Sequence, residues 1–84
     1  GCEECEVTRR CDNRIMKYII ERFGEDVTTA AYDMTSFRAF VNVELSPTFY
    51  GWVFGFGGKV QILSPDKAKN QYAEMLKSAM ETQA

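Results

Sequence analysis

The glycines at positions 55, 57 and 58, followed by Lys59, are the first candidate for chemistry in this sequence. A phosphate-binding loop has the pattern G-x-x-x-x-G-K-[ST], in which backbone N–H groups and the lysine contact the phosphates. That spacing would need a glycine in place of Val53 and a serine or threonine in place of Val60. These glycines also follow a predicted helix, whereas a phosphate loop precedes one. We therefore interpret the segment as a helix end and a turn.

The cysteines are a second candidate, because Cys2 and Cys5 have the C-x-x-C spacing of zinc sites and redox motifs. Cys11 would add a third ligand, but zinc needs a fourth and the chain has no histidine. A thioredoxin-type motif opens a helix after a strand, whereas this pair lies at the N-terminal end. We expect reduced thiols and no metal or other cofactor. The odd number of cysteines also argues against a disulfide framework.

A third candidate is the face of a predicted strand over residues 37–45, where Arg38, Phe40 and Asn42 alternate with apolar residues. The run S-F-R-A-F-V-N-V partly resembles the RNP1 pattern of RNA-recognition motifs, but it lacks the leading base, the glycine and two aromatic positions. Phe40 beside Arg38 can stack on a base or another planar ligand. The net charge of -2 argues against an independent nucleic-acid binder. The alternative is an exposed face or one that a partner chain covers.

Catalysis has little support in the residue types. The chain has no histidine, no acids that spacing pairs in an apolar pocket, and no serine or cysteine in a nucleophile-elbow motif. An acylphosphatase-like activity would need an anion-binding loop after the first strand. The Cys-Asp-Asn-Arg segment there lacks glycine, although it contains Arg14. We predict that the protein is not an enzyme.

The size of the chain indicates one small domain. Eighty-four residues bury roughly 60% of their unfolded surface, and the net stability of such a domain is a few kcal/mol. No apolar run approaches a membrane span and no secretory signal is visible, so we expect a cytoplasmic protein with no membrane contact. We interpret residues 4–84 as a single C-terminal regulatory domain cut from a longer protein. Residues 1–3 are expected to be a disordered start or a cloning remnant.

The hydrophobic pattern predicts seven elements that would position these candidates. Strands are predicted over residues 4–11, 26–32, 37–45 and 59–63. Helices are predicted from Asp12 or Asn13 to Phe23, from Ser46 to Gly57-Gly58, and from Ser64-Pro65 toward Ala84. The order matches the ferredoxin-like βαββαβ unit, an α+β fold with an antiparallel sheet and helices on one face, plus an added C-terminal helix. That last helix is expected to cover the sheet edge, the open face or a partner.

Three side chains do not fit the simple apolar pattern. Arg9 has the parity of Val7 and Cys11, so we expect it at a sheet edge or paired with an acid. Tyr50 and Phe54 lie off the apolar stripe of the second helix. They form either a second buried layer under the final helix or a contact surface.

Several ordered segments carry a family resemblance over nearly the whole chain. They are V-T-R-R-C-D-N, I-I-E-R-F-G-E-D-V and V-N-V-E-L-S-P-T-F-Y-G-W-V-F-G-F-G-G-K-V-Q-I-L-S-P-D, followed by an amphipathic helix that contains E-M-L. Together they resemble the C-terminal extension (WCX) domain of WYL-domain transcriptional regulators of bacteria. Arg9 departs from the apolar residue expected at its position in that family.

The resemblance implies a role in transcription regulation. In that family a helix-turn-helix domain binds DNA, a WYL domain senses a ligand or nucleic acid, and the WCX domain has a ferredoxin-like fold. The WCX domain is implicated in dimer contacts and in tuning the response. This sequence contains neither upstream part, so the resemblance implies a homodimer that works with WYL and helix-turn-helix domains. DNA would be contacted only through the missing domain.

Two functions follow as hypotheses. The first is a non-catalytic regulatory and dimerisation domain. Its expected contact surfaces are the open sheet face and one side of the second helix, with the residues Arg10, Arg38, Phe40, Asn42, Tyr50 and Phe54. The alternative is an ACT-like sensor of a small molecule or nucleotide, which would bind its ligand at the sheet face or a dimer seam. A concave pocket around Arg38 and Phe40 would indicate the sensor.

Overall fold

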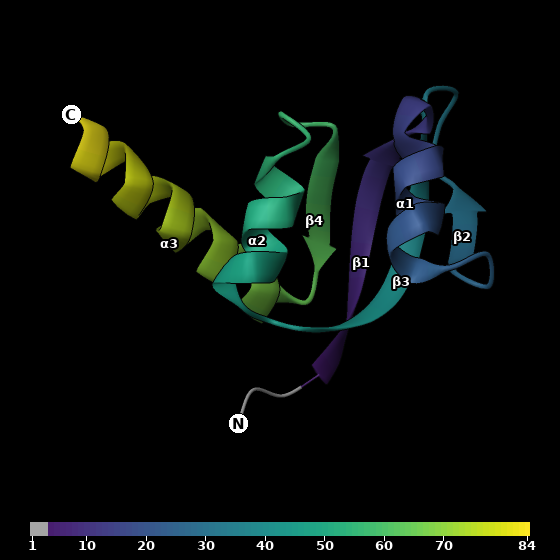
Figure 1. The fold of residues 1–84 in the computed structure, drawn as a ribbon, viewed down its shortest axis with the longest axis horizontal. Helices are drawn as coiled ribbons and strands as arrows, with labels where there is room; N and C mark the ends of the chain where they lie inside the picture. Colours follow the sequence, from purple (N-terminus) through teal and green to yellow (C-terminus); the bar gives the residue numbers. More distant parts are fainter. Residues whose placement is uncertain (1–3) are drawn as a thin grey trace.

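The computed structural model describes residues 4–84, and this part of the chain forms four strands, one 3₁₀ turn and three α-helices (Figure 1). In chain order the elements are β1 (Glu4–Asp12), η1 (Asn13–Ile15), α1 (Met16–Phe23), β2 (Thr28–Ala31), β3 (Ser36–Glu44), α2 (Pro47–Phe54), β4 (Val60–Ser64) and α3 (Asp66–Gln83). The predicted alternation of strands and helices is confirmed, with boundaries that move by a few residues.

The four strands form one sheet in the order β2-β3-β1-β4, and every neighbouring pair is antiparallel. β1 and β3 pair along their whole lengths, from Glu4 opposite Glu44 to Asp12 opposite Ser36. The predicted hairpin of β2 and β3 is confirmed. The predicted α+β class with an antiparallel sheet is therefore confirmed.

The helices occupy different places relative to the sheet. α1 and α2 lie on the same face of the sheet, and the opposite face carries no helix among residues 4–84 (Figure 1). α3 begins beside β4, and its C-terminal half extends away from the rest of the domain (Figure 1). Of the three places expected for this helix, the structure shows the sheet edge.

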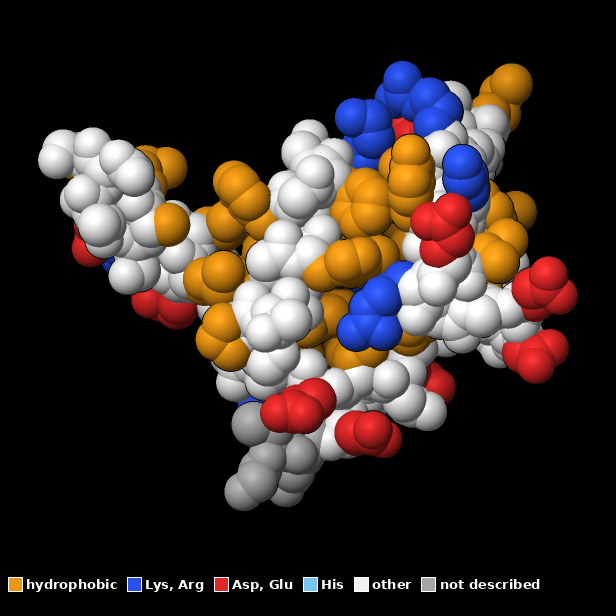
Figure 2. All heavy atoms as spheres, in the orientation of Figure 1, with side chains coloured by type: hydrophobic (Ala, Val, Ile, Leu, Met, Phe, Trp, Pro, Cys, Tyr) orange, Lys and Arg blue, Asp and Glu red, His pale blue; other side chains and the backbone are white. Residues whose placement is uncertain are grey.

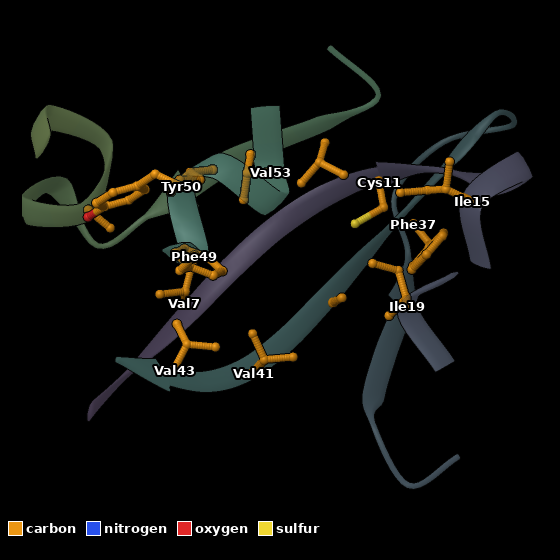
Figure 3. Close-up of a cluster of buried hydrophobic side chains, with 14 residues drawn as sticks. Val7, Cys11, Ile15, Ile19, Phe37, Val41, Val43, Phe49, Tyr50 and Val53 are labelled. Atoms are coloured by element: carbon orange, nitrogen blue, oxygen red, sulfur yellow. The ribbon is translucent and has the colours of Figure 1, made fainter. Parts of the chain in front are cut away.

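The hydrophobic core lies between the sheet and the helix pair. Strand alternation directs Val7 and Cys11 toward the helices, and both are fully buried. In Figure 3 the side chains of Val7 and Phe49 point toward each other, and so do those of Phe37 and Ile19. Each such burial contributes about 1.5–3 kcal/mol relative to an exposed side chain. This core fixes the positions of the sheet and of the two helices, whose outer sides carry the candidate contact residues.

The helix starts differ in how they are capped. The second helix begins at Ser46 as predicted: the Ser46 hydroxyl accepts a hydrogen bond of 3.2 Å from the Phe49 N–H, and Pro47 takes the first helical position. The sequence also predicts that the last helix begins at Ser64-Pro65 with the same pair of residue types, and the expected serine cap is wrong. Ser64 is the last residue of β4, opposite Thr8, and Pro65 takes the N-cap position without a side-chain hydrogen bond. Sheet pairing therefore holds the serine away from the helix end.

Glycines end the second helix earlier than predicted. α2 stops at Phe54 with Gly55 at its C-cap, so Gly57 and Gly58 do not terminate it. They form the turn into β4 with φ angles of 60° and 92°, a region that a Cβ atom disfavours. The interpretation of this segment as a helix end and turn, rather than a phosphate loop, fits this geometry.

Arg9 contradicts both expectations for it. β1 is a central strand, so Arg9 is not at a sheet edge, and it forms no ion pair within residues 4–84. Its side chain is fully buried, with the guanidinium carbon 4.6 Å, 5.1 Å and 5.9 Å from the ring centroids of Phe23, Trp52 and Phe49. The negative faces of aromatic rings attract a cation, so an aromatic box replaces the expected acid. Burial lowers the pKa of Arg9 to about 10, which leaves it charged at pH 7.

Candidate interaction surfaces

The open sheet face carries the four strand residues that the sequence placed there. Arg10 of β1 lies directly opposite Arg38 of β3, and Phe40 lies opposite Thr8 in the neighbouring row. Asn42 follows on the same face of β3 and is exposed. The Arg10 Nε donates a 2.9 Å hydrogen bond to the Gln61 Oε1 of β4. Alternation alone brings these groups together.

The two arginines give one end of this face a positive charge, whereas Glu4, Glu6 and Glu44 lie on the other end of the same face. Like charges directly opposite each other in a sheet are destabilising, and neither arginine forms an ion pair within the described part of the chain. The ring of Tyr32 partly compensates, with its centroid 5.5 Å from the Arg38 guanidinium carbon and 5.9 Å from that of Arg10. The patch therefore suits an acidic or planar group on a partner.

The structure does not join Arg38 and Phe40 in one pocket. Phe40 borders a shallow hollow of about 250 Å³ together with Val27 and Asn42, and Arg38 is not among the residues that line this hollow. The concave site that would indicate a sensor on this face is therefore not formed by this pair.

Tyr50 and Phe54 have different environments. Tyr50 is buried, with 4% of its surface exposed, and its hydroxyl donates a 2.7 Å hydrogen bond to the Gln71 Oε1 of α3. Its ring also stacks on Tyr72 of α3 at a centroid distance of 5.6 Å. Phe54, one helical turn later, is 61% exposed because α3 has already diverged from α2. Tyr50 belongs to a buried layer under α3, and Phe54 alone remains on a free surface.

An apolar groove between α3 and β4 is a surface that sequence reasoning missed. It has a volume of about 450 Å³, and hydrophobic side chains line both sides of the hollow between the projecting helix and the body (Figure 2). The body contributes Phe54, Val60 and Ile62, and α3 contributes Tyr72, Ala73 and Leu76. Arg10, Gln61 and Lys69 also border it. The groove, called here the α3 groove, is open at the free edge of β4.

One sequence signal could have indicated the α3 groove. A helix of 18 residues is about 27 Å long, whereas a strand of five residues spans about 17 Å. The apolar stripe of α3 continues past Leu76 to Met80, which is 74% exposed. The predicted helix is therefore longer than the strand that it accompanies, and its outer half lacks a partner among residues 4–84.

In the segment between β1 and α1, the Asp12 carboxylate is hydrogen-bonded to Arg14. Asp12 accepts hydrogen bonds of 2.8 Å, 2.9 Å and 2.9 Å from the backbone N–H, Nε and Nη2 of Arg14. Figure 2 shows Lys and Arg side chains gathered around an acidic group at this end of the domain, and Lys59 borders the same hollow of about 300 Å³. An acylphosphatase-like enzyme would present its donors to a substrate anion here. The groups of Arg14 are engaged by Asp12 instead.

Replacing Asp12 by asparagine is expected to make stability less dependent on acidic pH. The hydrogen bonds from Arg14 hold the pKa of the Asp12 carboxyl well below its usual range. The folded-state pKa is thus below the unfolded value of about 3.9, so the contribution is present above that pH and is lost as the pH falls further. Urea denaturation at pH 6 and pH 3 measures the loss, which should be smaller in D12N than in the original chain. The exposed Asp26→Asn is the matched control, and an unchanged loss in D12N would contradict the assignment.

The geometry defines a small α+β domain with an open sheet face and an apolar groove beside β4. A family model of the WCX domain matches residues 3–80, and the chain therefore belongs to the WCX domain family. The predicted resemblance to the WCX domain is confirmed. No curated protein and no solved structure shows significant similarity to the chain. Among residues 4–84, no helix has both the length and the apolar character needed to cross a bilayer.

Proposed function

We propose that this chain is the regulatory and dimerisation domain of a bacterial transcriptional regulator that also has WYL and helix-turn-helix domains. Its membership of the WCX family supports the regulatory role. The other domains bind DNA, and this domain adjusts that DNA binding without catalysing a reaction. The hydrogen bonds from Arg14 to Asp12 support the absence of catalysis, because the side chain that would bind a substrate anion in this loop is paired with Asp12 instead.

We also infer that the fold is ferredoxin-like. Two features support this inference: the strand order β2-β3-β1-β4 with antiparallel neighbours, and the helices α1 and α2 on one face. Each helix connects two strands that are separated by a third one, as in a split βαβ unit. α3 is then the addition that distinguishes this domain, and it is the element that carries the α3 groove.

The α3 groove is the observation that carries the dimerisation proposal. Exposed large apolar side chains that lie together indicate an interaction site. Here the exposed Phe54 lines a groove with apolar walls, and the exposed Met80 follows one helical turn after Leu76 of that wall. A projecting helix with an apolar stripe and an apolar groove therefore belong to the same chain. Two copies related by a two-fold axis would place the outer half of each α3 against the groove of the other. Such an interface would be self-complementary, so a second copy of this chain is the proposed occupant.

The open sheet face is the second contact surface of the proposed regulator. Arg10 and Arg38 lack acidic partners within the described residues and attract an acidic surface on a neighbouring domain. Phe40 and Asn42 provide a stacking group and an amide beside them. Contacts of this kind would weaken as the salt concentration rises, whereas contacts in the α3 groove would not.

Sedimentation velocity tests the proposed dimer. The chain should sediment as a dimer whose dissociation constant rises at least about 10-fold in F54E or L76E, since each change places an unpaired charge in an apolar contact. Met34→Glu is the matched control because Met34 is 96% exposed on the β2–β3 turn, outside the groove. A monomer at millimolar concentration, or a dimer that neither groove variant weakens, would overturn the assignment.

A further inference from the structure

One end of the open sheet face holds more positive charge than its own acid neutralises (Figure 2). A polar hollow of about 300 Å³ lies there, and Arg10, Arg14 and Lys59 form part of its wall. Asp12 is the single acidic residue among those that line it, so three cations and one carboxylate leave a net charge of +2. Arg38, directly opposite Arg10 in the sheet, adds a further cation nearby. An anion in the hollow would relieve the repulsion between these groups.

Backbone hydrogen bonds fix the segments that carry these groups. The Asp12 N–H donates a 2.9 Å bond to the Lys59 carbonyl oxygen, which extends the pairing of β1 and β4 by one residue. The Asn13 N–H donates a 2.9 Å bond to the Thr35 carbonyl oxygen and so attaches the β2–β3 turn to the same end of β1. Binding of an anion would therefore need little further ordering of the backbone.

Three donors of the hollow remain available within residues 4–84. The Arg10 side chain donates there only from its Nε to Gln61, which leaves both Nη atoms for a ligand. Lys59 forms no ion pair in this part of the chain. Gly58 also lines the hollow, and its N–H donates no backbone hydrogen bond among the described residues. Successive N–H groups in a turn of this kind, with positive φ at Gly57 and Gly58, make a concavity that suits an anion.

The Asp12 carboxylate is an internal anion at this end of the domain. It accepts three hydrogen bonds from Arg14, and these bonds, with the charge of Lys59 contributing, hold the pKa of Asp12 well below its usual range. Asp12 thus neutralises one of the three cations and repels a second anion. It is therefore a competitor of any anionic ligand, and its removal should strengthen binding.

We propose that this hollow binds a phosphate group, either free phosphate or a small phosphate monoester. The Nη atoms of Arg10, the ammonium group of Lys59 and the N–H of Gly58 donate hydrogen bonds to its oxygens. A phosphate group has three strong acceptor oxygens and a charge near about −2 at pH 7, which matches donors from three segments and the net charge of the hollow. A carboxylate carries less charge and is best satisfied by one planar guanidinium.

The charges on the rest of the face disfavour a nucleic-acid strand as the ligand. Glu4, Glu6 and Glu44 lie at the other end of the same face, so a polyanion that followed β1 would be repelled there. A small ligand with one phosphate group does not reach that end. The site also differs from a nucleotide-binding phosphate loop, because its glycine turn leads into β4 and not into a helix.

A bound phosphate would also affect the contacts of the proposed regulator. It would compete with the acidic surface of a neighbouring domain for Arg10, which lies on the open sheet face. This consequence rests on the proposed function, whereas the binding of phosphate does not.

Titration of the 84-residue chain with inorganic phosphate, followed by calorimetry and by amide chemical shifts, tests this assignment. Phosphate and methyl phosphate should bind, with the largest shifts at Gly58 and Lys59. Dimethyl phosphate, which has one negative charge, should bind about 10-fold or more weakly. No binding of phosphate at about 20 mM, or an effect equal to that of chloride at the same ionic strength, would overturn the assignment. So would tighter binding of a single-stranded oligonucleotide than of methyl phosphate.

Substitutions of the cations locate the site. Lys59→Gln and Arg10→Gln should each raise the dissociation constant for phosphate about 10-fold or more, because a hydrogen bond from a charged donor is lost. Lys67→Gln is the matched control, since Lys67 is exposed at the start of α3, beyond the other end of β4. Unchanged affinity in both K59Q and R10Q, or an equal loss in K67Q, would overturn the assignment.

Substitution of the internal anion gives a change in the opposite direction. Asp12→Asn should lower the dissociation constant for phosphate about 10-fold, because it removes a competing charge and frees the Arg14 guanidinium. Asp26→Asn makes the same change of charge outside the hollow and should leave the affinity unchanged. If D12N bound phosphate no more tightly than D26N, the assignment would be wrong. The sedimentation test uses Phe54 and Leu76, so failure of phosphate binding and failure of the dimer are distinguishable.

Discussion

Replacing Arg9 by methionine is expected to raise the free energy of unfolding by about 1–4 kcal/mol. Arg9 is fully buried in β1 and has no hydrogen-bond partner within residues 4–84. Its pKa is lowered to about 10, first by desolvation, with the positive charge of Arg22 also contributing. Methionine keeps much of the length and the contact with the rings, and it removes the charge that must be desolvated. Contacts with three rings oppose this gain, but they replace only part of the lost hydration.

Urea denaturation followed by fluorescence measures this effect directly. Trp52 is the only tryptophan in the chain, and it contacts Arg9, so its emission reports both unfolding and the state of the aromatic box. Arg9→Ala is the matched comparison, and it should destabilise the domain because it leaves a cavity beside the rings. If R9M were destabilised as much as R9A, the cation–π contacts would outweigh desolvation, and the prediction would be wrong.

Replacing Ile19 by alanine is expected to lower the free energy of unfolding by about 2–4 kcal/mol. Ile19 is fully buried in α1 and packs against the sheet, so its truncation removes apolar contact and leaves a cavity. The loss is a large part of the stability of a domain of this size, and I19A should be partly unfolded at 37 °C. Circular dichroism during thermal unfolding and urea titration would measure it.

The neighbouring residue provides the control for this substitution. Ile20 lies on the same helix and is 37% exposed, so I20A should cost less than about 1 kcal/mol. Both variants make the same chemical change and gain the same helix propensity, which leaves burial as the difference between them. Equal losses in I19A and I20A would contradict the placement of α1 against the sheet.

The cost of Arg9 connects stability with function. A core position that would be more stable with an apolar residue is one where sequence and fold disagree, and such disagreements are expected at functional sites.

Local patterns were sufficient for the secondary structure and for one candidate surface. Alternation in β1 and β3 predicts that Arg10, Arg38, Phe40 and Asn42 share a face, because side chains in a strand alternate regardless of what the strand packs on. Ser46-Pro47 predicts the start of α2, because its hydrogen bond closes within three residues. Ser64-Pro65 has the same two residue types, but sheet pairing with β1 decides the role of Ser64. A signal confined to a few residues is reliable only where no distant strand competes for them.

The sequence by itself determined the element order, the antiparallel α+β class, the face of each strand residue and the WCX family. Only the tertiary structure decided which aromatic residues are buried and which charges are unpaired. Tyr50 is buried and Phe54 is exposed because α3 packs on α2 at its first turns and then diverges. Arg9 lies in an aromatic box because α1 and α2 bring Phe23, Phe49 and Trp52 to one point of β1. Packing between elements that are distant in sequence depends on crossing positions, which hydrophobic periodicity does not encode.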